Sequence, residues 1–161
     1  MMSLDDGQSS GHNPDAAPVR VRPMARGDLA AVTDLCAQLG YPVAPDQLAH
    51  RFELVLEQPQ NALLVAEDPD GERVVGWMHL AGRVYLEGEP YTHVVGIVVD
   101  ERERSRGVGR ALMAAAEAWA AEHGYDEVRL WSNIVRERAH RFYEGLGYEH
   151  VKTSKVFRKA M

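Results

Sequence analysis

The stretch from Val98 to Leu112 constrains the fold more than any other part of the sequence. Two valines end an apolar run, a short charged loop follows, and Gly107 and Gly109 open a strongly helical stretch. Glycine has no Cβ, so a bulky anion can approach its backbone closely. The first amides of a helix lack partners within the helix, and the helix dipole makes that end positive. This strand-to-helix junction therefore predicts a phosphate site on the loop backbone.

The residues around this junction narrow the range of ligands. Arg104, Arg106 and Arg110 add cationic donors for phosphate oxygens. A P-loop requires Gly-Lys followed by Ser or Thr, whereas Gly109 is followed by arginine and alanine. A dinucleotide-binding fingerprint requires glycine or alanine where Leu112 stands, and an early place in the chain. The pattern that remains is Arg-x-x-Gly-x-Gly.

Strand and helix patterns alternate along the rest of the chain. We expect strands at Val19–Pro23, Asn61–Glu67, Val74–Leu86, Tyr91–Val99, Glu127–Trp131 and Tyr148–Phe157. We expect helices at Asp28–Leu39, Asp46–Glu57, Ala111–His123 and Arg136–Gly145. The resulting order, β-α-α-β-β-β-α-β-α-β, predicts a mixed α/β domain.

Composition and charge limit the classes of function. The chain has 161 residues, of which 45% are hydrophobic and 26% charged, values that suit one soluble domain with its own core. Residues 1–18 hold almost no large apolar side chains, so we expect a flexible tail there and a single domain over residues 19–161. The net charge of −6 argues against a nucleic-acid partner and favours a cationic amine substrate.

Cysteine, histidine and hydropathy patterns point to a metal-free cytoplasmic protein. Cys36 is the only cysteine, which excludes an intrachain disulfide and favours a reducing compartment. The seven histidines show no metal-binding spacing, so no metal is expected. No apolar run is long enough to cross a bilayer, and the N-terminus lacks the features of a signal peptide, so no membrane partner is expected.

A second motif lies between Leu130 and Tyr148. Ser132-Asn133 precedes a helical Ala-x-x-x-Tyr, formed by Ala139 and Tyr143, and the helix ends in Gly-Tyr. Together with the Arg-x-x-Gly-x-Gly loop, this pattern resembles the GNAT superfamily of N-acetyltransferases. The stretch from Ala139 to Tyr143 is similar to that of the aminoalkylphosphonate acetyltransferases within it. The chain departs from many members at Arg136, where they carry asparagine.

The resemblance implies a fold, a co-substrate and a set of contacts. The fold would be a central twisted mixed sheet of six to seven strands, flanked by about four helices, with a splayed strand pair that receives the arm of coenzyme A. The co-substrate would be acetyl-CoA, with its pyrophosphate on the loop amides. The implied contact residues are Ile97, Val98, Val99, Arg104, Ser105, Arg106, Gly107, Val108, Gly109, Arg110, Asn133, Ala139, Phe142 and Tyr143.

Two residues are candidates for proton transfer. Tyr143 matches the general acid of the family, which protonates the departing thiolate. His93 stands on the strand where several members place a glutamate, four residues before Ile97, so it is the candidate general base. An alkylammonium group with a pKa of ~10 must lose a proton before its nitrogen can attack. An ordinary strand histidine is the alternative.

The resemblance therefore implies an N-acetyltransferase that moves an acetyl group from acetyl-CoA to a primary amine by direct attack in a ternary complex. A small-molecule acceptor is favoured, because the chain is compact and carries no partner-binding module. Two alternatives stay open: a protein lysine or N-terminal acetyltransferase, and a non-catalytic acyl-CoA sensor. Small members of the family often dimerise, so a homodimer is expected.

Overall fold

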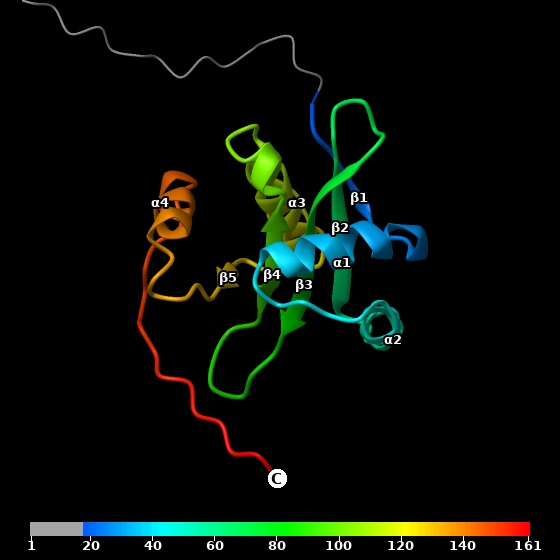
Figure 1. Cartoon of the computed structure of the whole chain (residues 1–161). Helices are drawn as coiled ribbons and strands as arrows, with labels where there is room; N and C mark the ends of the chain where they lie inside the picture. Colours follow the sequence, from blue (N-terminus) through cyan, green and yellow to red (C-terminus); the bar gives the residue numbers. More distant parts are fainter. Residues whose placement is uncertain (1–17) are drawn as a thin grey trace, which may run out of the picture.

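The computed structural model describes residues 18–161 as five strands, four α-helices and two 3-10 helices (Figure 1). The strands are β1 (Arg20–Pro23), β2 (Asn61–Glu67), β3 (Val74–Arg83), β4 (Tyr91–Val99) and β5 (Val128–Leu130). The helices are α1 (Leu29–Gln38), α2 (Pro45–Leu56), α3 (Val108–Glu122) and α4 (Glu137–Gly145), with the 3-10 helices η1 (Arg26–Asp28) and η2 (Glu101–Glu103). The tail expected over residues 1–18 lies outside the described residues, except for Pro18. Within residues 18–161, no helix is both long and apolar enough to cross a bilayer.

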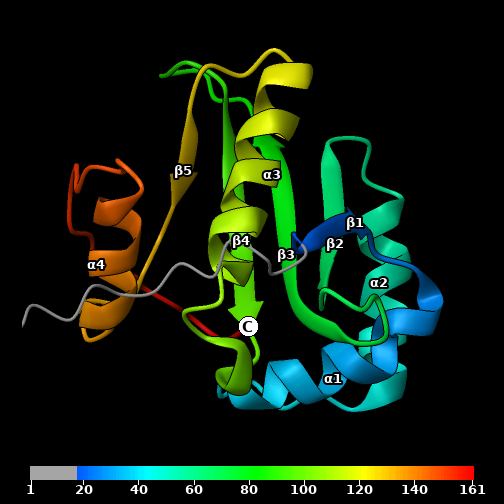
Figure 2. The ribbon, with the colours of Figure 1, turned by 90° about the horizontal axis from the view of Figure 1, so that it is seen from above.

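One mixed sheet forms the centre of the molecule. Its strands lie in the order β1-β2-β3-β4-β5, antiparallel from β1 to β4, and β5 runs parallel to β4. A parallel pair requires a crossover connection, which α3 supplies. Figure 2 shows α3 on one face of the sheet and α1 and α2 on the other. The mixed α/β arrangement expected from the sequence is confirmed.

Two apolar clusters, one on each face, hold the sheet between its helices. On the α3 face, Met78, Leu80 and Leu112 are fully buried. On the other face, Phe52 of α2 and Val65 of β2 lie in the second cluster with residues of α1. Since β4 and α3 both contribute to the first cluster, the loop that joins them is fixed at both ends.

The predicted element bounds hold best where the sheet is central. β2 and β4 have the predicted ends, whereas β3 ends at Arg83, three residues before the predicted Leu86. Arg83 pairs with Tyr91, the first residue of β4, so the ladder closes there and the following residues have no partner strand. α3 begins at Val108 and not at Ala111, because Gly107 ends the loop directly before it.

The C-terminal strand predicted at Tyr148–Phe157 is wrong. Residues 149–161 form no regular secondary structure and are exposed throughout, and the sheet therefore has five strands and not six to seven. In Figure 1 this segment runs away from the sheet. The alternating pattern is a property of the segment alone, whereas a strand requires a neighbour to hydrogen-bond with. None of the described strands lies alongside it.

Candidate active site

β4 and β5 separate over half of the length of β4. The two strands pair only from Thr92 to Val94, opposite Val128–Leu130. Beyond Val94, the edge of β4 that faces β5 has no strand partner among the described residues. The edge of β4 at Ile97, Val98 and Val99, the three residues expected to bind the pantetheine arm, therefore has no neighbouring strand. We call this separation of the two strands the β4–β5 gap.

A β-bulge lies at the start of this gap. His79 of β3 pairs with Gly96 and Leu80 pairs with Val94, so Val95 is an extra residue in β4. A bulge kinks its strand and redirects nearby backbone groups. It therefore changes the direction of β4 where β4 leaves β5.

The loop after β4 has an uncommon backbone conformation. Gly107 has φ +84° and Ser105 has φ +69°, both in the left-handed region. An L-residue enters this region at a steric cost, which explains the glycine at position 107. Left-handed residues in a short loop can turn successive amides toward one side and form a concave anion site.

The first turn of α3 leaves its amides available to a ligand. The first hydrogen bond that closes the helix runs from the Ala111 amide to the Gly107 carbonyl, at 2.9 Å. No side chain caps the helix, and the amides of Val108, Gly109 and Arg110 have no acceptor among the described residues. Val108 itself is buried in the core, which anchors this turn.

Gly109 also lets α4 approach α3. A Cβ at this position would lie 3.0 Å from Cζ of Phe142, and real Cβ atoms are seldom that close to a neighbour. The ring of Phe142 therefore covers the first turn of α3, directly beside the free amides. The two motifs singled out in the sequence meet at this contact.

The loop arginines are paired, although the sequence had suggested free cationic donors. Arg104 pairs with Glu101 at 3.3 Å, and Arg106 pairs with Glu103 at 3.1 Å. Arg110 is exposed on α3. In this structure the loop therefore offers a phosphate mainly its backbone amides, with Arg110 beside them.

Two buried carboxylates organise this loop. Asp100 is 5% exposed and accepts hydrogen bonds from the backbone and side chain of Arg102, which hold its pKa below the usual range. Glu103 accepts bonds from Arg106 and from Arg73, a residue outside the loop. Sequence reasoning missed both roles, because acidic residues interleaved with arginines look like a solvated loop.

The candidate base, His93, is buried against an aromatic ring. Its imidazole meets the indole of Trp131 edge-on, with ring centroids 3.7 Å apart. Its Nδ1 is buried and has no hydrogen-bond partner among the described residues. Burial, with smaller contributions from Arg83 and His79, lowers the pKa of His93 to about 4. The ring is neutral at pH 7, but it is a weak proton acceptor for an alkylammonium group.

The candidate acid, Tyr143, lies on α4 in a partly buried cluster. Its ring packs edge-on against Phe142 at 5.2 Å and against Tyr148 at 6.3 Å. Burial raises the pKa of Tyr143 above its usual value, and Arg136 opposes this. The phenol therefore keeps its proton at neutral pH, as a general acid must.

Asn133 and Ala139 complete the set of expected contacts. The Oδ1 of Asn133 accepts a hydrogen bond from the Val135 amide at 3.1 Å, so this side chain shapes the turn between β5 and α4. Ala139 is half-buried on α4. Both lie in a region that includes the exposed side chains of Trp131 and Ile134.

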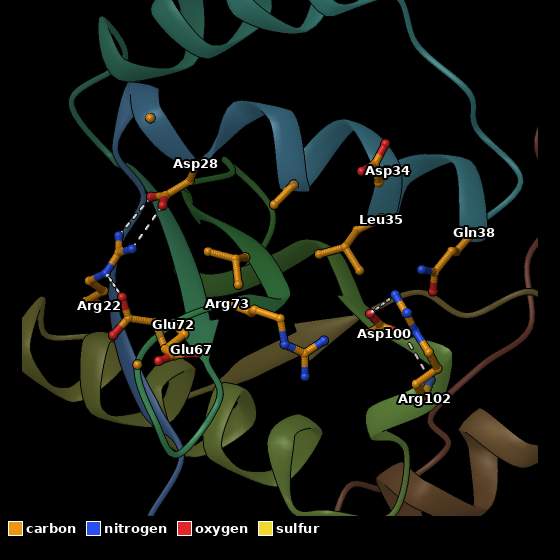
Figure 3. A pocket seen from close by; sticks show the side chains of 14 residues that line it. Arg22, Asp28, Asp34, Leu35, Gln38, Glu67, Glu72, Arg73, Asp100 and Arg102 are labelled. Atoms are coloured by element: carbon orange, nitrogen blue, oxygen red, sulfur yellow. Dashed lines mark hydrogen bonds and ion pairs between the residues drawn. The ribbon is translucent and has the colours of Figure 1, made fainter.

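A cavity of about 400 Å³ lies elsewhere, between α1 and the β2–β3 turn (Figure 3). Its lining is held by ion pairs, chiefly Arg22 with both oxygens of Asp28 at 2.8 and 2.9 Å and with Glu67 at 2.6 Å. None of the predicted contact residues lines it. The cavity is therefore separate from the β4–β5 gap.

The sequence and the fold match a known family. Residues 29–148 match the acetyltransferase (GNAT) family, so the chain belongs to this family and is an acetyl-CoA-dependent N-acetyltransferase. The GNAT-like fold expected from the sequence is therefore confirmed, with five strands in its sheet.

Several relatives share most of the chain. It is 30% identical over 147 residues to aminoglycoside N(6')-acetyltransferase type 1 of Stenotrophomonas maltophilia, which covers 89% of this chain and 94% of the relative. The protein of the same name from Klebsiella aerogenes is 31% identical over 157 residues, or 91% and 99% of the two chains. A solved structure of aminoglycoside N-acetyltransferase AAC(6')-Iy with CoA has a TM-score of 0.80 at 24% identity, over 92% and 99% of the chains, and shows the shared fold. These relatives are aminoglycoside enzymes and not the aminoalkylphosphonate acetyltransferases that the sequence suggested.

Proposed function

We propose that this enzyme acetylates a primary amine of a small polycationic molecule of the aminoglycoside type. The observation that carries the proposal is the open edge of β4, which leads directly into a loop with unpaired amides. The names of two relatives that align over most of their length supply the acceptor class. The net charge of −6 supports it, because a negative protein attracts cations.

The proposed binding mode uses both the open edge of β4 and the unpaired amides of the loop that follows it. The amides of residues 107–110 bind the pyrophosphate of acetyl-CoA, and the free edge of β4 at Ile97–Val99 binds the pantetheine arm as a strand would. An amide of this edge, beside the bulge at Val95, polarises the thioester carbonyl. Phe142 covers the phosphate end, and Arg104, Ser105, Arg106, Asn133 and Ala139 line the remainder.

In the proposed reaction, the neutral amine attacks the thioester carbonyl carbon within a ternary complex. A C–N bond forms, the C–S bond breaks, and the thiolate takes a proton from Tyr143. The nitrogen loses its extra proton to solvent, and the Tyr143 phenolate takes a proton back from solvent. We assign Tyr143 and not His93 to proton transfer, because the low pKa of His93 and its contact with Trp131 favour a packing role.

A panel of amines tests the proposal by CoA release at fixed acetyl-CoA. The panel contains an aminoglycoside, a linear polyamine, an aminoalkylphosphonate and a lysine peptide. We expect the aminoglycoside to give the largest kcat/KM. Preference for the phosphonate would restore the subgroup suggested by the sequence, preference for the peptide would indicate a protein acetyltransferase, and CoA binding without any turnover would indicate a sensor.

The homodimer expected from the resemblance also remains a proposal. Trp131, Ile134 and Val135 are exposed near α4, and Val156 and Phe157 are almost fully exposed in the C-terminal segment. A second copy would cover such side chains. Light scattering coupled to size-exclusion chromatography tests this, and a monomer at micromolar concentration would refute it.

A further inference from the structure

A buried carboxylate connects the phosphate loop to a distant hairpin. The side chain of Glu103 is 9% exposed. Its Oε1 accepts a hydrogen bond from Nη2 of Arg73 at 3.0 Å, and its Oε2 accepts one from Nη1 of Arg106 at 3.1 Å. Arg73 lies in the β2–β3 turn and Arg106 lies in the phosphate loop, so one side chain ties the two segments together.

Arg73, at the end of this connection away from the phosphate loop, is itself held in place. Nε of Arg73 donates to Oδ2 of Asp68 at 3.2 Å. The other oxygen of Asp68 accepts the amides of Glu72 and Arg73 at 2.9 and 3.1 Å. These bonds, led by the one from the Arg73 amide, lower the pKa of Asp68. Arg73 is thus anchored in the β2–β3 turn and not in the phosphate loop.

The loop requires such an anchor. Ser105 has φ +69°, and a non-glycine residue persists in this region only where its surroundings hold it. Its two neighbours, Arg104 and Arg106, each pair with a glutamate of η2. The Arg104–Glu101 pair is exposed at both ends and contributes little, as surface ion pairs generally do. The Glu103 pair is the one with a buried carboxylate and a link beyond the loop.

A carboxylate beside a phosphate site would ordinarily repel the ligand. Here each oxygen of Glu103 is engaged by a guanidinium, so the charge of the carboxylate is balanced, and the group of Arg73, Arg106, Glu103 and Asp68 is neutral overall. The arrangement is suited to holding the loop rather than to contacting the ligand.

We propose that Glu103 is a positioning residue for acetyl-CoA binding: through Arg73 and Arg106 it holds residues 104–107 in the phosphate-binding conformation before the ligand arrives. Binding to a preformed loop avoids the entropic cost of ordering it. The proposal rests on the assignment of this loop to the pyrophosphate of acetyl-CoA.

The test compares Glu103→Gln with Glu72→Gln. Glu72 is an exposed neighbour of Arg73, and its carboxylate forms none of the ion pairs found within residues 18–161, so it controls for the change in charge. We expect Glu103→Gln to raise the Kd for CoA, measured by calorimetry, by about tenfold, because the loop must now be ordered on binding. The KM for acetyl-CoA should rise in parallel, whereas kcat and the KM for the amine should stay within about twofold, since the reacting atoms are untouched.

Arg73→Lys shows whether the connection works through Glu103. A lysine cannot hold Asp68 and Glu103 together in the way that the arginine fork does. Alone it should raise the Kd for CoA by about fivefold, but in the Glu103→Gln background it should add less than about twofold, because both changes break one connection. This variant also keeps the test decisive if Glu103→Gln folds poorly.

Three results would overturn the proposal. They are an unchanged Kd for CoA in Glu103→Gln, a double variant whose rise in Kd equals the product of the rises in the two single variants, and a rise in the KM for the amine as large as that for acetyl-CoA. If the wild-type protein binds no CoA, the proposed function fails instead. Hydrogen exchange at the Ala111 amide then decides the positioning role, because faster exchange in Glu103→Gln than in Glu72→Gln shows that Glu103 holds this turn, and equal exchange refutes it.

Discussion

The two sides of the β4–β5 gap are built very differently. On one side, the loop before α3 is held by the buried carboxylates of Asp100 and Glu103 and by the buried side chain of Val108. On the other side, β5 has three residues, none of the residues of α4 is buried, and Trp131 is 60% exposed. The loop side, one wall of the proposed cofactor site, is therefore well packed, while the β5–α4 side, the other wall, has few internal contacts of its own.

This difference implies that the two walls open at different free energies. Regions with few buried apolar contacts open at low free energy, whereas packed regions open only with the whole domain. The phosphate loop would then supply affinity with little reorganisation, and the β5–α4 side would be ordered by ligands or by a second copy of the chain.

The largest expected difference is in the free energy of unfolding when one leucine on each side of the gap is replaced by alanine. Leu112→Ala empties a fully buried site in α3 and should lower the free energy of unfolding by about 2–5 kcal/mol. Leu146→Ala, at the end of α4, removes a side chain that is only partly buried and should cost less than about 1 kcal/mol. Urea denaturation measures both, and equal losses would abolish the distinction between the walls.

Gly107→Val should abolish most of the affinity for CoA. Valine is strained at φ +84°, so the loop must change conformation, and we expect the Kd to rise by at least about a hundredfold. Gly88→Val is the matched control, because Gly88 has an ordinary φ and open space around it. Calorimetry with CoA measures the change. Retained binding in Gly107→Val would refute the assignment of the phosphate loop.

Tyr143→Phe tests the chemistry of the less packed wall. The ring packing is kept and the hydroxyl is lost, so kcat should fall by about tenfold, less than for many acid catalysts because a thiolate leaves easily. Tyr148→Phe is the control, since its hydroxyl donates to Glu117 and is not expected to meet substrate. Steady-state kinetics at saturating acetyl-CoA gives the comparison, and an unchanged kcat in Tyr143→Phe removes this residue from the mechanism.

The smallest effect is expected for His93→Gln. Burial lowers the pKa of His93 to about 4, so its ring stays neutral from pH 6 upward and gains no charge in the working range. The pH dependence of kcat/KM between pH 6 and 9 should therefore match that of the wild type. Loss of a rising limb in this range would show that His93 is the base after all, with its pKa raised in the complex.

The sequence predicted the packed wall better than the open one. The bounds of β2 and β4 were correct because their apolar runs are long and end at turns. The two glycines could be singled out because their backbone chemistry is local, and Gly107 has the positive φ that favours glycine. The missing strand at Tyr148–Phe157 could not be foreseen, because pairing depends on a partner elsewhere. The burial of Glu103 was equally hidden, since it depends on Arg73, thirty residues away.

The contact between His93 and Trp131 gives the molecule an optical reporter. Trp131 is exposed and stands where β5 leaves β4, whereas Trp77 and Trp119 are partly buried on the two faces of the sheet. Indole emission depends on the polarity around the ring. A ligand that fills the β4–β5 gap would exclude water from the surroundings of Trp131, the most exposed of the three indoles, so tryptophan fluorescence can follow occupancy of the gap without any label.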